Sequence, residues 1–377
     1  MLNSYSASRL NGLDHLRAFA IAYVFLTHYS GLFAHPKWLE GPGSFGWSGV
    51  DLFFVLSGYL ISGQLLGYLA DGQRIPVSEF YIKRFFRIIP AYLLLVSVYF
   101  AVPAIRETTG IQPLWKFLTF TENLGFDGGL GRSFSHAWSL CVEEHFYLVL
   151  PLLLIPLAGA RTCWAIWVAA AVFLGGVAIR IYAWQVQVAN YVDWYEWIYY
   201  PTYSRLDGLL VGVMAAATQR FEPLRWRQLT QHPHLLLCSG LVLLIIAELI
   251  CTKRLSFASS VFSFPLIAVG YGLVLVAAVS PTCFLHRVRL TVTAFLASVS
   301  YSLYLVHKIT IYIAQTALSH TQVSVDGVLT FLVCIAVSIT GAWALHVAVE
   351  RPFMNLRSVV LSNRGRDRGG RGEYVPQ

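Results

Sequence analysis

The sequence predicts an all-α integral membrane protein with about ten transmembrane helices, and three features indicate this class. Only 12% of the 377 residues are charged and 56% are hydrophobic, whereas a soluble domain carries about 25% charged residues. The apolar residues form long blocks near or above the roughly 18-residue length that spans a bilayer. These blocks lack the alternation of a membrane β-barrel, so helices are the expected spanning elements.

Ten apolar blocks are long enough to be spans. The first carries Arg17 and His28 and has no small-residue cleavage site, so we do not expect a cleaved signal peptide. Seven blocks hold no charged residue: 18–34, 52–70, 88–105, 162–179, 255–285, 290–307 and 327–349. Three are interrupted: 138–160 by Glu143 and Glu144, 198–219 by Arg205 and Asp207, and 233–251 by Glu248.

The basic residues predict the orientation. An even number of spans places both termini on one side of the membrane. With a cytoplasmic N-terminus, the inside segments and tail hold eighteen Lys and Arg residues and the outside segments hold six. Because basic residues accumulate on the cytoplasmic side, we expect both termini to be cytoplasmic, in the cell (inner) membrane. The net charge of +8 is then mostly a topology signal, and no nucleic-acid partner is expected.

The chain is expected to form one ten-helix membrane domain over residues 1–356, followed by a basic tail over 357–377. The tail is rich in Arg and Gly with little to bury, so we expect it to be disordered and to lie on anionic membrane lipid. The six cysteines are scattered without metal-ligand spacing, so we expect no metal site.

Arg17 and His28 lie in the first span, eleven residues apart. At about 100° per residue both side chains share one helical face, separated by about 16 Å along the axis. A buried imidazole suits proton transfer or nucleophilic attack because its unperturbed pKa is near neutrality. Alternatively, the His bonds a neighbouring helix and the Arg only follows the charge rule. The shared face favours a site.

Three carboxylates at or inside spans are further candidates, because charges there are expensive and usually functional. Asp51 starts the second span and is a candidate to bind a substrate, to orient a partner side chain, or simply to complement the helix dipole. Glu143 and Glu144 lie one to two turns inside a span, where packing explains them poorly. One is a candidate to orient or charge-balance His28, and the other to touch a substrate.

Lys83, Arg84 and Arg87 precede Pro90 at the expected cytoplasmic edge of the third span. Arg84 and Arg87 are at i and i+3 and therefore neighbours on one helix face. Two adjacent guanidinium groups match phosphate oxygens well. The alternative is a basic loop that only anchors the topology.

Other polar and aromatic residues have a structural interpretation beside the functional one. Arg205 and Asp207 are interpreted first as a structural ion pair, with each other or with other helices, and second as site-lining residues. Tyr301 belongs to a polar strip that helix-to-helix hydrogen bonding explains, although a place near the site is compatible with it. Trp138 either stacks on a sugar ring or belongs to an interfacial aromatic belt.

Five blocks in order make the chain resemble the membrane acyltransferase-3 family, over roughly residues 10–356. Members O-acylate sugars in bacterial surface polysaccharides, Nod factors and antibiotics. The departures are Cys141 where a Ser is common, His145 where a Gln is common and Val306 where an aromatic is common. The blocks are 13–18 leading to His28; 49–59; Arg84-Phe85-Phe86-Arg87 with Pro90; 138–147; and 300–307 with 349–353.

The resemblance implies an acyl-CoA donor, acetyl-CoA above all, that enters from the cytoplasm, and a hydroxyl of a carbohydrate or glycoconjugate as acceptor. It implies that His28 is the catalytic histidine, that Arg17 positions it or contacts the donor, and that Arg84 and Arg87 hold the CoA phosphates, with Lys83 beside them. The length of the pantetheine arm of CoA is on the order of the 16 Å that separates Arg17 from His28 along the helix axis.

Several alternatives stay open. His28 acts either as a general base on the acceptor hydroxyl or as a nucleophile that takes the acyl group first, and N-acylation is a third possibility. The rival from another class is a proton-coupled transporter or flippase of a polar or lipid-linked substrate, which intramembrane Arg, Glu and His would also suit. The paired Arg84 and Arg87 favour the enzyme, because a carrier needs no phosphate clamp.

Overall fold

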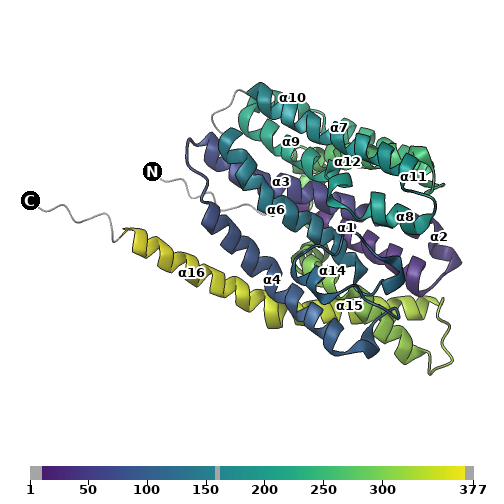
Figure 1. Cartoon of the computed structure of the whole chain (residues 1–377). Coiled ribbons are helices and arrows are strands. Elements are labelled where there is room, and N and C mark those ends of the chain that lie inside the picture. The colour runs from purple at the N-terminus through teal and green to yellow at the C-terminus, as the bar shows by residue number, and fades with distance from the viewer. Residues whose placement is uncertain (1–10, 158–161, 370–377) are drawn as a thin grey trace, which may run out of the picture. The chain divides into compact units, whose positions relative to one another are not determined.

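The computed structural model describes residues 11–157 and 162–369, and within these ranges the chain is built from helices without β-strands (Figure 1). The predicted fold class is confirmed: this is an all-α multi-pass membrane protein. In the described part, nine helical segments are long and apolar enough to cross a membrane: Asn11–Phe33, Gly46–Ala70, Val77–Ala101, Ser135–Pro156, Trp167–Val186, Pro233–Cys251, Phe257–Val279, Thr291–Leu318 and Val328–Asn363.

The predicted span 198–219 differs from the others. Its helix, α9 (Asp207–Phe221), has 15 residues, and the chain before it forms a π turn, η7 (Tyr195–Tyr199), and a 3-10 turn, η8 (Thr202–Ser204). Pro201 lies between the two turns, has no N–H to donate and has an extended backbone, with a ψ of 136°. The apolar block is therefore continuous in composition and broken in structure.

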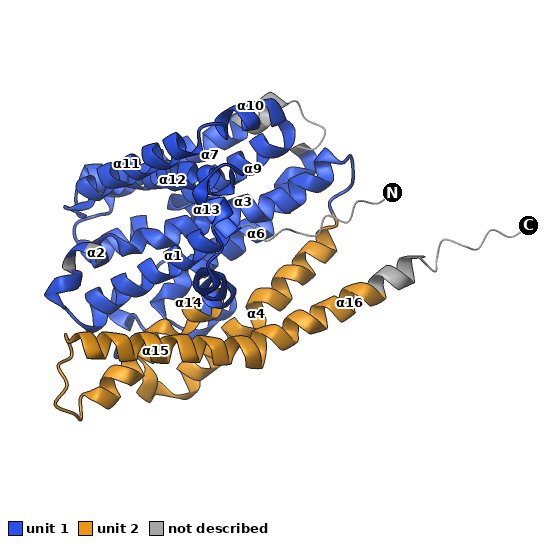
Figure 2. Ribbon diagram, turned by 180° about the vertical axis from the view of Figure 1, so that it is seen from behind, with its two compact units in different colours: residues 1–75, 107–300 blue, residues 76–106, 301–377 orange. Residues whose placement is uncertain are grey.

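The helices group into two compact units (Figure 2). Unit 1 comprises 1–75 and 107–300, and unit 2 comprises 76–106 and 301–377. Helix α14 (Thr291–Leu318) contributes to both. The other main helices of unit 1 are α1 (Asn11–His28), α3 (Gly49–Ala70), α6 (Trp138–Leu157), α7 (Thr162–Val186), α9, α11 (Pro233–Cys251) and α12 (Phe257–Val279). Its short helices are α2 (Glu40–Ser44), α5 (Leu114–Leu118), α8 (Tyr191–Trp194), α10 (Pro223–Leu229) and α13 (Phe284–Arg287).

Glycines bring the central helices of unit 1 into backbone contact. A Cβ at Gly58 of α3 would overlap the carbonyl oxygen of Leu209 on α9, and one at Gly212 of α9 would overlap that of Val55. Small residues allow such close approach between membrane helices, where packing replaces the hydrophobic effect as the driving force. Helix α3 also packs on α1 and α12.

Unit 2 contains α4 (Val77–Ala101), the second part of α14, α15 (Val328–Leu345), the π turn η9 (His346–Glu350) and α16 (Arg351–Gly369). Helix α4 packs on η9 and α16. The π turn has a cause in the sequence, because Pro352 cannot donate the next helical hydrogen bond and its ring crowds the preceding turn.

The tail differs from the expectation of disorder from residue 357. Helix α16 continues without interruption to Gly369, because the preceding residues already form a helix and the following Arg and Ser residues propagate it at little cost. The last residues, 370–377, lie outside the described part of the chain.

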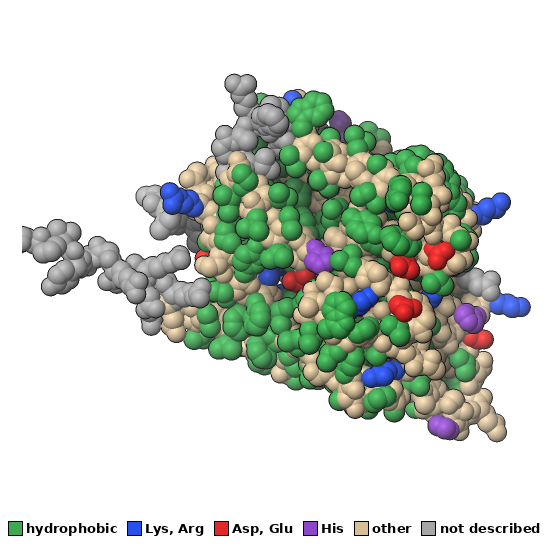
Figure 3. Space-filling model, in the orientation of Figure 1, with side chains coloured by type: hydrophobic (Ala, Val, Ile, Leu, Met, Phe, Trp, Pro, Cys, Tyr) green, Lys and Arg blue, Asp and Glu red, His purple; other side chains and the backbone are tan. Residues whose placement is uncertain are grey.

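The exterior has the character of a lipid-facing surface. Hydrophobic side chains are spread over much of the face shown in Figure 3, with few charged groups among them. Large apolar side chains on several spanning helices are at least half exposed, which a soluble protein would avoid in such numbers. They include Leu152, Trp167, Leu174, Ile245, Leu249, Val292 and Leu329.

Candidate active site

His28 is the last residue of α1 and precedes a π turn, η1 (Tyr29–Phe33). Its Nδ1 lies 3.0 Å from the carbonyl oxygen of Val24. A carbonyl oxygen only accepts hydrogen bonds, so Nδ1 carries the proton in this contact, and in the neutral imidazole Nε2 then holds the lone pair. The fold thus presents His28 in the tautomer that a base or nucleophile needs, at the end of a helix and half-buried.

Arg17 lies on the same helix, within α1 as predicted. Both Arg17 and His28 are half-buried, and eleven residues of helix separate them by about 16 Å along the axis. The shared helical face predicted from their spacing is therefore present in the structure.

A second histidine lies beside His28. The ring centroids of His28 and His136 are 6.2 Å apart, and His136 is fully buried, in a 3-10 turn (η6, Ser135–Ala137) just before α6. His136 was not singled out from the sequence. Its position two residues before Trp138, at the start of a span with two carboxylates, was the signal that could have done so.

The chain before His136 is strained. Phe134 has a φ of 58°, in the left-handed region that bulky residues avoid. Its N–H donates to Glu107 Oε1 at 3.0 Å, and its ring stacks on Phe117 with centroids 5.8 Å apart. The same ring meets His136 edge-on at 5.0 Å. Glu107 and Phe117 thus hold the strained Phe134 in position, and its ring in turn packs against His136.

Glu143 is held by a hydroxyl from another helix. Ser57 Oγ of α3 donates to Glu143 Oε1 at 2.5 Å, and the Tyr147 hydroxyl donates to Ser57 Oγ at 3.3 Å. Glu143 and the adjacent Glu144 are both half-buried on α6. Successive residues of a helix point about 100° apart, so the two carboxylates differ in direction, and the contact with Ser57 anchors Glu143 to α3.

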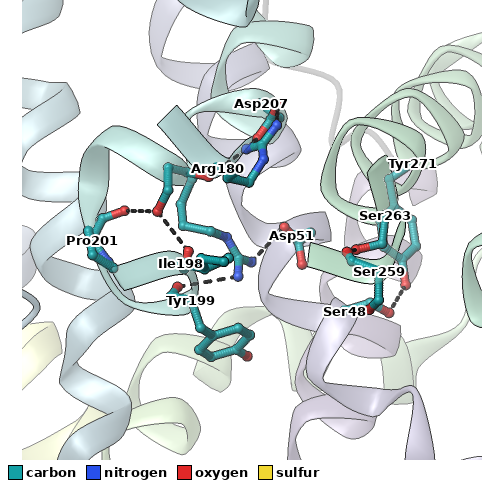
Figure 4. Close-up of polar contacts among 12 residues, drawn as sticks. Ser48, Asp51, Arg180, Ile198, Tyr199, Pro201, Asp207, Ser259, Ser263 and Tyr271 are labelled. Carbon is teal, nitrogen blue, oxygen red and sulfur yellow. Dashed lines mark hydrogen bonds and ion pairs between the residues drawn. The ribbon is translucent and has the colours of Figure 1, made fainter. Parts of the chain in front are cut away.

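Asp51 is buried and paired inside unit 1 (Figure 4). Its Oδ1 accepts from Arg205 Nη2 at 2.8 Å. The guanidinium of Arg205 lies 5.0, 4.7 and 4.2 Å from the ring centroids of Trp138, Tyr199 and Phe264. Of the roles that the sequence left open for Asp51, this geometry supports orienting a partner, because only 3% of the residue is exposed.

A second buried ion pair lies close by in the chain. Arg180 of α7 donates from Nη1 and Nη2 to the two oxygens of Asp207, at 2.6 and 3.0 Å, and also to the carbonyl of Ser204 at 2.6 Å. Arg205 and Asp207 thus pair with other helices and not with each other. Arg180 was not expected, because the predicted span ended one residue before it. The two pairs fix the broken segment before α9 to its neighbours (Figure 4).

Trp138 begins α6 and is only 4% exposed. Its ring centroid lies 4.9 Å from Tyr199, 5.6 Å from Tyr200 and 5.9 Å from Phe54. Burial raises the pKa of Tyr199 and of Tyr200, so both phenols stay protonated at physiological pH. Trp138 is therefore part of an internal aromatic cluster in this structure, and neither an interfacial belt nor an open stacking platform.

The predicted phosphate-binding residues all lie on α4 of unit 2. Lys83 forms an ion pair with Glu79 one turn earlier at 2.6 Å, and the Arg84 guanidinium lies 6.0 Å from the Phe80 ring centroid. Arg87 pairs with Glu350 of η9 and lies 5.9 Å from the Tyr301 ring.

Glu350 is the centre of a buried polar network in unit 2 and is 1% exposed. Its Oε1 accepts from Arg87, and its Oε2 accepts from Ser302 Oγ at 2.8 Å and contacts His346 Nδ1 at 3.0 Å. Tyr301, for which the sequence left open both helix-to-helix hydrogen bonding and a place near the site, donates its hydroxyl to the carbonyl of Ile88 at 2.7 Å.

The predicted site residues thus fall into two groups. Unit 1 holds those near the two histidines and the buried ion pairs: Arg17, His28, Asp51, Trp138, Glu143 and Glu144. Unit 2 holds the basic group and its partners: Lys83, Arg84, Arg87 and Tyr301. Among the described residues, no three His, Cys, Asp or Glu side chains are grouped so that they could hold a metal ion.

Comparison with known proteins decides the family. A family model described as an acyltransferase domain matches residues 10–347, which is most of the chain. The protein belongs to the acyltransferase-3 family. Among curated relatives, the O-acetyltransferase OatA of Staphylococcus aureus is 34% identical over 164 residues, and so is the peptidoglycan O-acetyltransferase OatA of Listeria monocytogenes.

These alignments cover 40% of this acyltransferase-3 chain and 25% of each relative, so the chain spans about a quarter of the length of the relatives that it matches. No solved structure matches the chain. Membership of the family indicates an acyl-transfer enzyme.

Proposed function

We propose that the protein transfers an acyl group, acetyl above all, from acyl-CoA to a hydroxyl of a carbohydrate or glycoconjugate at the cell (inner) membrane, with both termini cytoplasmic. The observation that carries the proposal is the tautomer of His28. Its Nδ1–H is used by the Val24 carbonyl, so Nε2 is the basic atom, as proton abstraction from a hydroxyl requires.

The reaction follows from this atom. Nε2 of His28 takes the proton from the acceptor hydroxyl while the oxygen attacks the thioester carbonyl. The C–S bond then breaks, and the imidazolium returns the proton to the departing CoA thiolate. Atoms and charges balance: an ester and a free thiol replace an alcohol and a thioester, and His28 ends neutral.

The imidazolium that forms in between needs a negative partner, since burial disfavours a lone positive charge. Glu143 and Glu144 are the candidate carboxylates, and the hydroxyl of Ser57 restricts the rotamers of Glu143. Arg17 is proposed to position the donor at the other end of the helix face. The variant in which His28 first takes the acyl group on Nε2 uses the same tautomer. Detection of an acyl-enzyme would distinguish it.

The donor is proposed from the basic group of α4. CoA carries several phosphate charges, and Lys83, Arg84 and Arg87 offer cations on neighbouring turns of one helix. Arginine forks match phosphate oxygens in geometry as well as in charge. The basic group and this chemistry fit one another, and acyl-CoA supplies the activated acyl group when it is bound.

The acceptor is proposed from the relatives. One of them is named a peptidoglycan O-acetyltransferase, so a peptidoglycan-type glycan is the first acceptor to test. The buried aromatic cluster around Trp138 does not by itself select a sugar.

The test is transfer of radiolabelled acetyl from acetyl-CoA to a glycan extract in membranes that contain the protein. His28→Ala is compared with the wild type, and His320→Ala is the matched control because His320 is exposed in the loop after α14. Label on a glycan that disappears only with His28→Ala supports the proposal. Absence of transfer from any short acyl-CoA, together with absence of CoA binding, would favour the transporter or flippase instead.

A further inference from the structure

The short helix α5 turns large apolar side chains to the outside of the protein. Leu114, Trp115 and Leu118 are 42%, 58% and 54% exposed. The one charged residue of this helix, Lys116, is directed toward the protein, because its Nζ donates to two backbone carbonyl oxygens of the loop that follows. The exposed face of α5 is therefore apolar and carries no charge.

The backbone at the end of α5 satisfies its own hydrogen bonds. The Lys116 carbonyl accepts from the Thr121 N–H at 2.8 Å, and the next carbonyl accepts from the Phe120 N–H at 3.2 Å. This is a Schellman cap, and Phe120, with a φ of 54°, occupies the left-handed position that glycine usually takes. The carbonyl one residue before Lys116 accepts from the N–H and the hydroxyl of Thr119, at 3.0 and 2.8 Å. Carbonyl groups satisfied in this way tolerate contact with lipid, where water does not replace a missing partner.

The buried face of α5 places the helix at the level where a span begins. Phe117 is fully buried, and its ring stacks on that of Phe134 with centroids 5.8 Å apart. Phe134 directly precedes the candidate span Ser135–Pro156. The first residues of a span lie at the boundary between headgroups and acyl chains, where tryptophan is enriched and amphipathic helices bind. The exposed face of α5 is therefore continuous in depth with the lipid-facing surface of the spans.

The same contact connects α5 with the two histidines. The ring of Phe134 meets that of His136 at 5.0 Å, and His136 lies 6.2 Å from His28. Among the described residues, Phe120 and Phe134 are the two non-glycine residues with positive φ, and they lie on the C-terminal side of α5 and before the next span. Strained backbone persists where the surrounding structure holds it. The position of α5 therefore helps to hold Phe134, and with it the ring beside His28.

We propose that α5 is an interfacial helix, whose exposed face lies against membrane lipid at the headgroup level, and that this lipid contact keeps the strained loop and His136 in place beside His28. The lipid contact stands apart from the proposed function. The link to His136 rests on the proposed function, because its readout is acyl transfer.

The first test measures quenching of Trp115 fluorescence by lipid. The full chain is placed in phosphatidylcholine nanodiscs with or without bromine on the acyl chains, and the signal of Trp115 is the difference between the wild type and Trp115→Phe. Trp167→Phe gives the matched lipid-facing signal, because Trp167 is 69% exposed at the start of a candidate span. Brominated lipid should quench the Trp115 signal as it quenches that of Trp167.

Two results of this test would overturn the lipid contact. A Trp115 signal that brominated lipid leaves unchanged and that dissolved iodide quenches would place α5 in water. A Trp115 signal that responds to soluble peptidoglycan fragments and not to brominated lipid would make the exposed face a glycan-binding surface instead.

The second test places a charge on the exposed face. Leu118→Glu should weaken the quenching of Trp115 and lower kcat for acetyl transfer by roughly 10–100-fold at unchanged KM for acetyl-CoA, since small displacements near a site cost this much. Leu118→Met keeps an apolar side chain and should retain both properties. Leu224→Glu is the matched control, because Leu224 is 77% exposed on α10, outside the candidate spans, and it should change neither.

The two tests separate the parts of the proposal. A wild-type kcat in Leu118→Glu, with the quenching of Trp115 lost, would overturn the link to His136 and keep the lipid contact. Quenching of Trp115 without any acetyl transfer by the wild type would also keep the lipid contact, and the link to His136 would then fall together with the proposed function.

Discussion

Replacement of Asp51 by Ala distinguishes between the two roles that remain for this residue, acceptor binding and support of Arg205. In the structure the side chains of Arg205 and Asp51 are 0% and 4% exposed and meet at 2.8 Å. Asp51→Ala would leave the guanidinium buried with aromatic rings and one long backbone contact, to the Tyr199 carbonyl at 3.4 Å. We therefore expect Asp51→Ala to lower the stability of the folded protein, and not to affect one kinetic step selectively.

The magnitude follows from the burial. Removal of one partner of a buried ion pair costs about 3–5 kcal/mol, and cation–π contacts with Trp138, Tyr199 and Phe264 already exist in the wild type and offset none of this loss. At about 2 °C per kcal/mol, the expected decrease in Tm is roughly 6–10 °C. The Tm of Asp51→Asn should lie between those of Asp51→Ala and the wild type, because Asn keeps a hydrogen-bond acceptor oxygen without the charge.

The assay is thermal unfolding followed by a thiol-reactive dye in detergent. Cys141, Cys251, Cys283 and Cys334 are buried and become reactive on unfolding. The double variant Asp51→Ala, Arg205→Met should recover part of the loss, since no unpaired charge remains. An Asp51→Ala protein with wild-type Tm but no transfer activity would refute this reasoning and restore the acceptor-binding role.

Three further predictions concern the histidines and Glu143. His28→Ala should lower kcat for acetyl transfer by roughly 10²–10⁴-fold, while the thermal shift caused by CoA stays as in the wild type; loss of that shift would mean that the variant is misfolded. Ser57→Ala removes a hydrogen bond to a carboxylate worth about 1.5–3 kcal/mol and should decrease kcat with little change in KM, and an unchanged kcat would show that Glu143 needs no anchor. His136→Ala should lower kcat about tenfold in the same assay, at constant KM for the donor, because the cavity left beside His28 allows its ring to rotate. A change in KM alone would contradict this.

The spans were largely predictable, because the cost of placing a residue in lipid depends on that residue and its neighbours in the chain. The predicted block 198–219 shows where prediction from local composition fails. Its composition is apolar, yet Pro201 and the pairs made by Arg205 and Asp207 break the helix, and α9 begins only at Asp207. The partners of those pairs, Asp51 and Arg180, are distant in sequence, so local composition could not reveal the break.

The candidate site was predictable where residues share one helix. The common face of Arg17 and His28 follows from helical geometry alone and is present in α1. His136 was missed because its proximity to His28 depends on the fold of the loop that contains the strained Phe134. The partner of Arg87 was missed for the same reason: Glu350 is more than 260 residues away and reaches it through a π turn.

That π turn also determines which way Glu350 faces relative to α15. A π turn closes its hydrogen bonds one residue further along than an α-helix, so it is equivalent to one inserted residue in a regular helix. Removal of Val347 would leave a straight helix and rotate Glu350 by about 100° relative to α15, away from Arg87. The one-residue offset of the π turn thus places a carboxylate beside the basic helix α4, while the hydropathy of the span is unaffected.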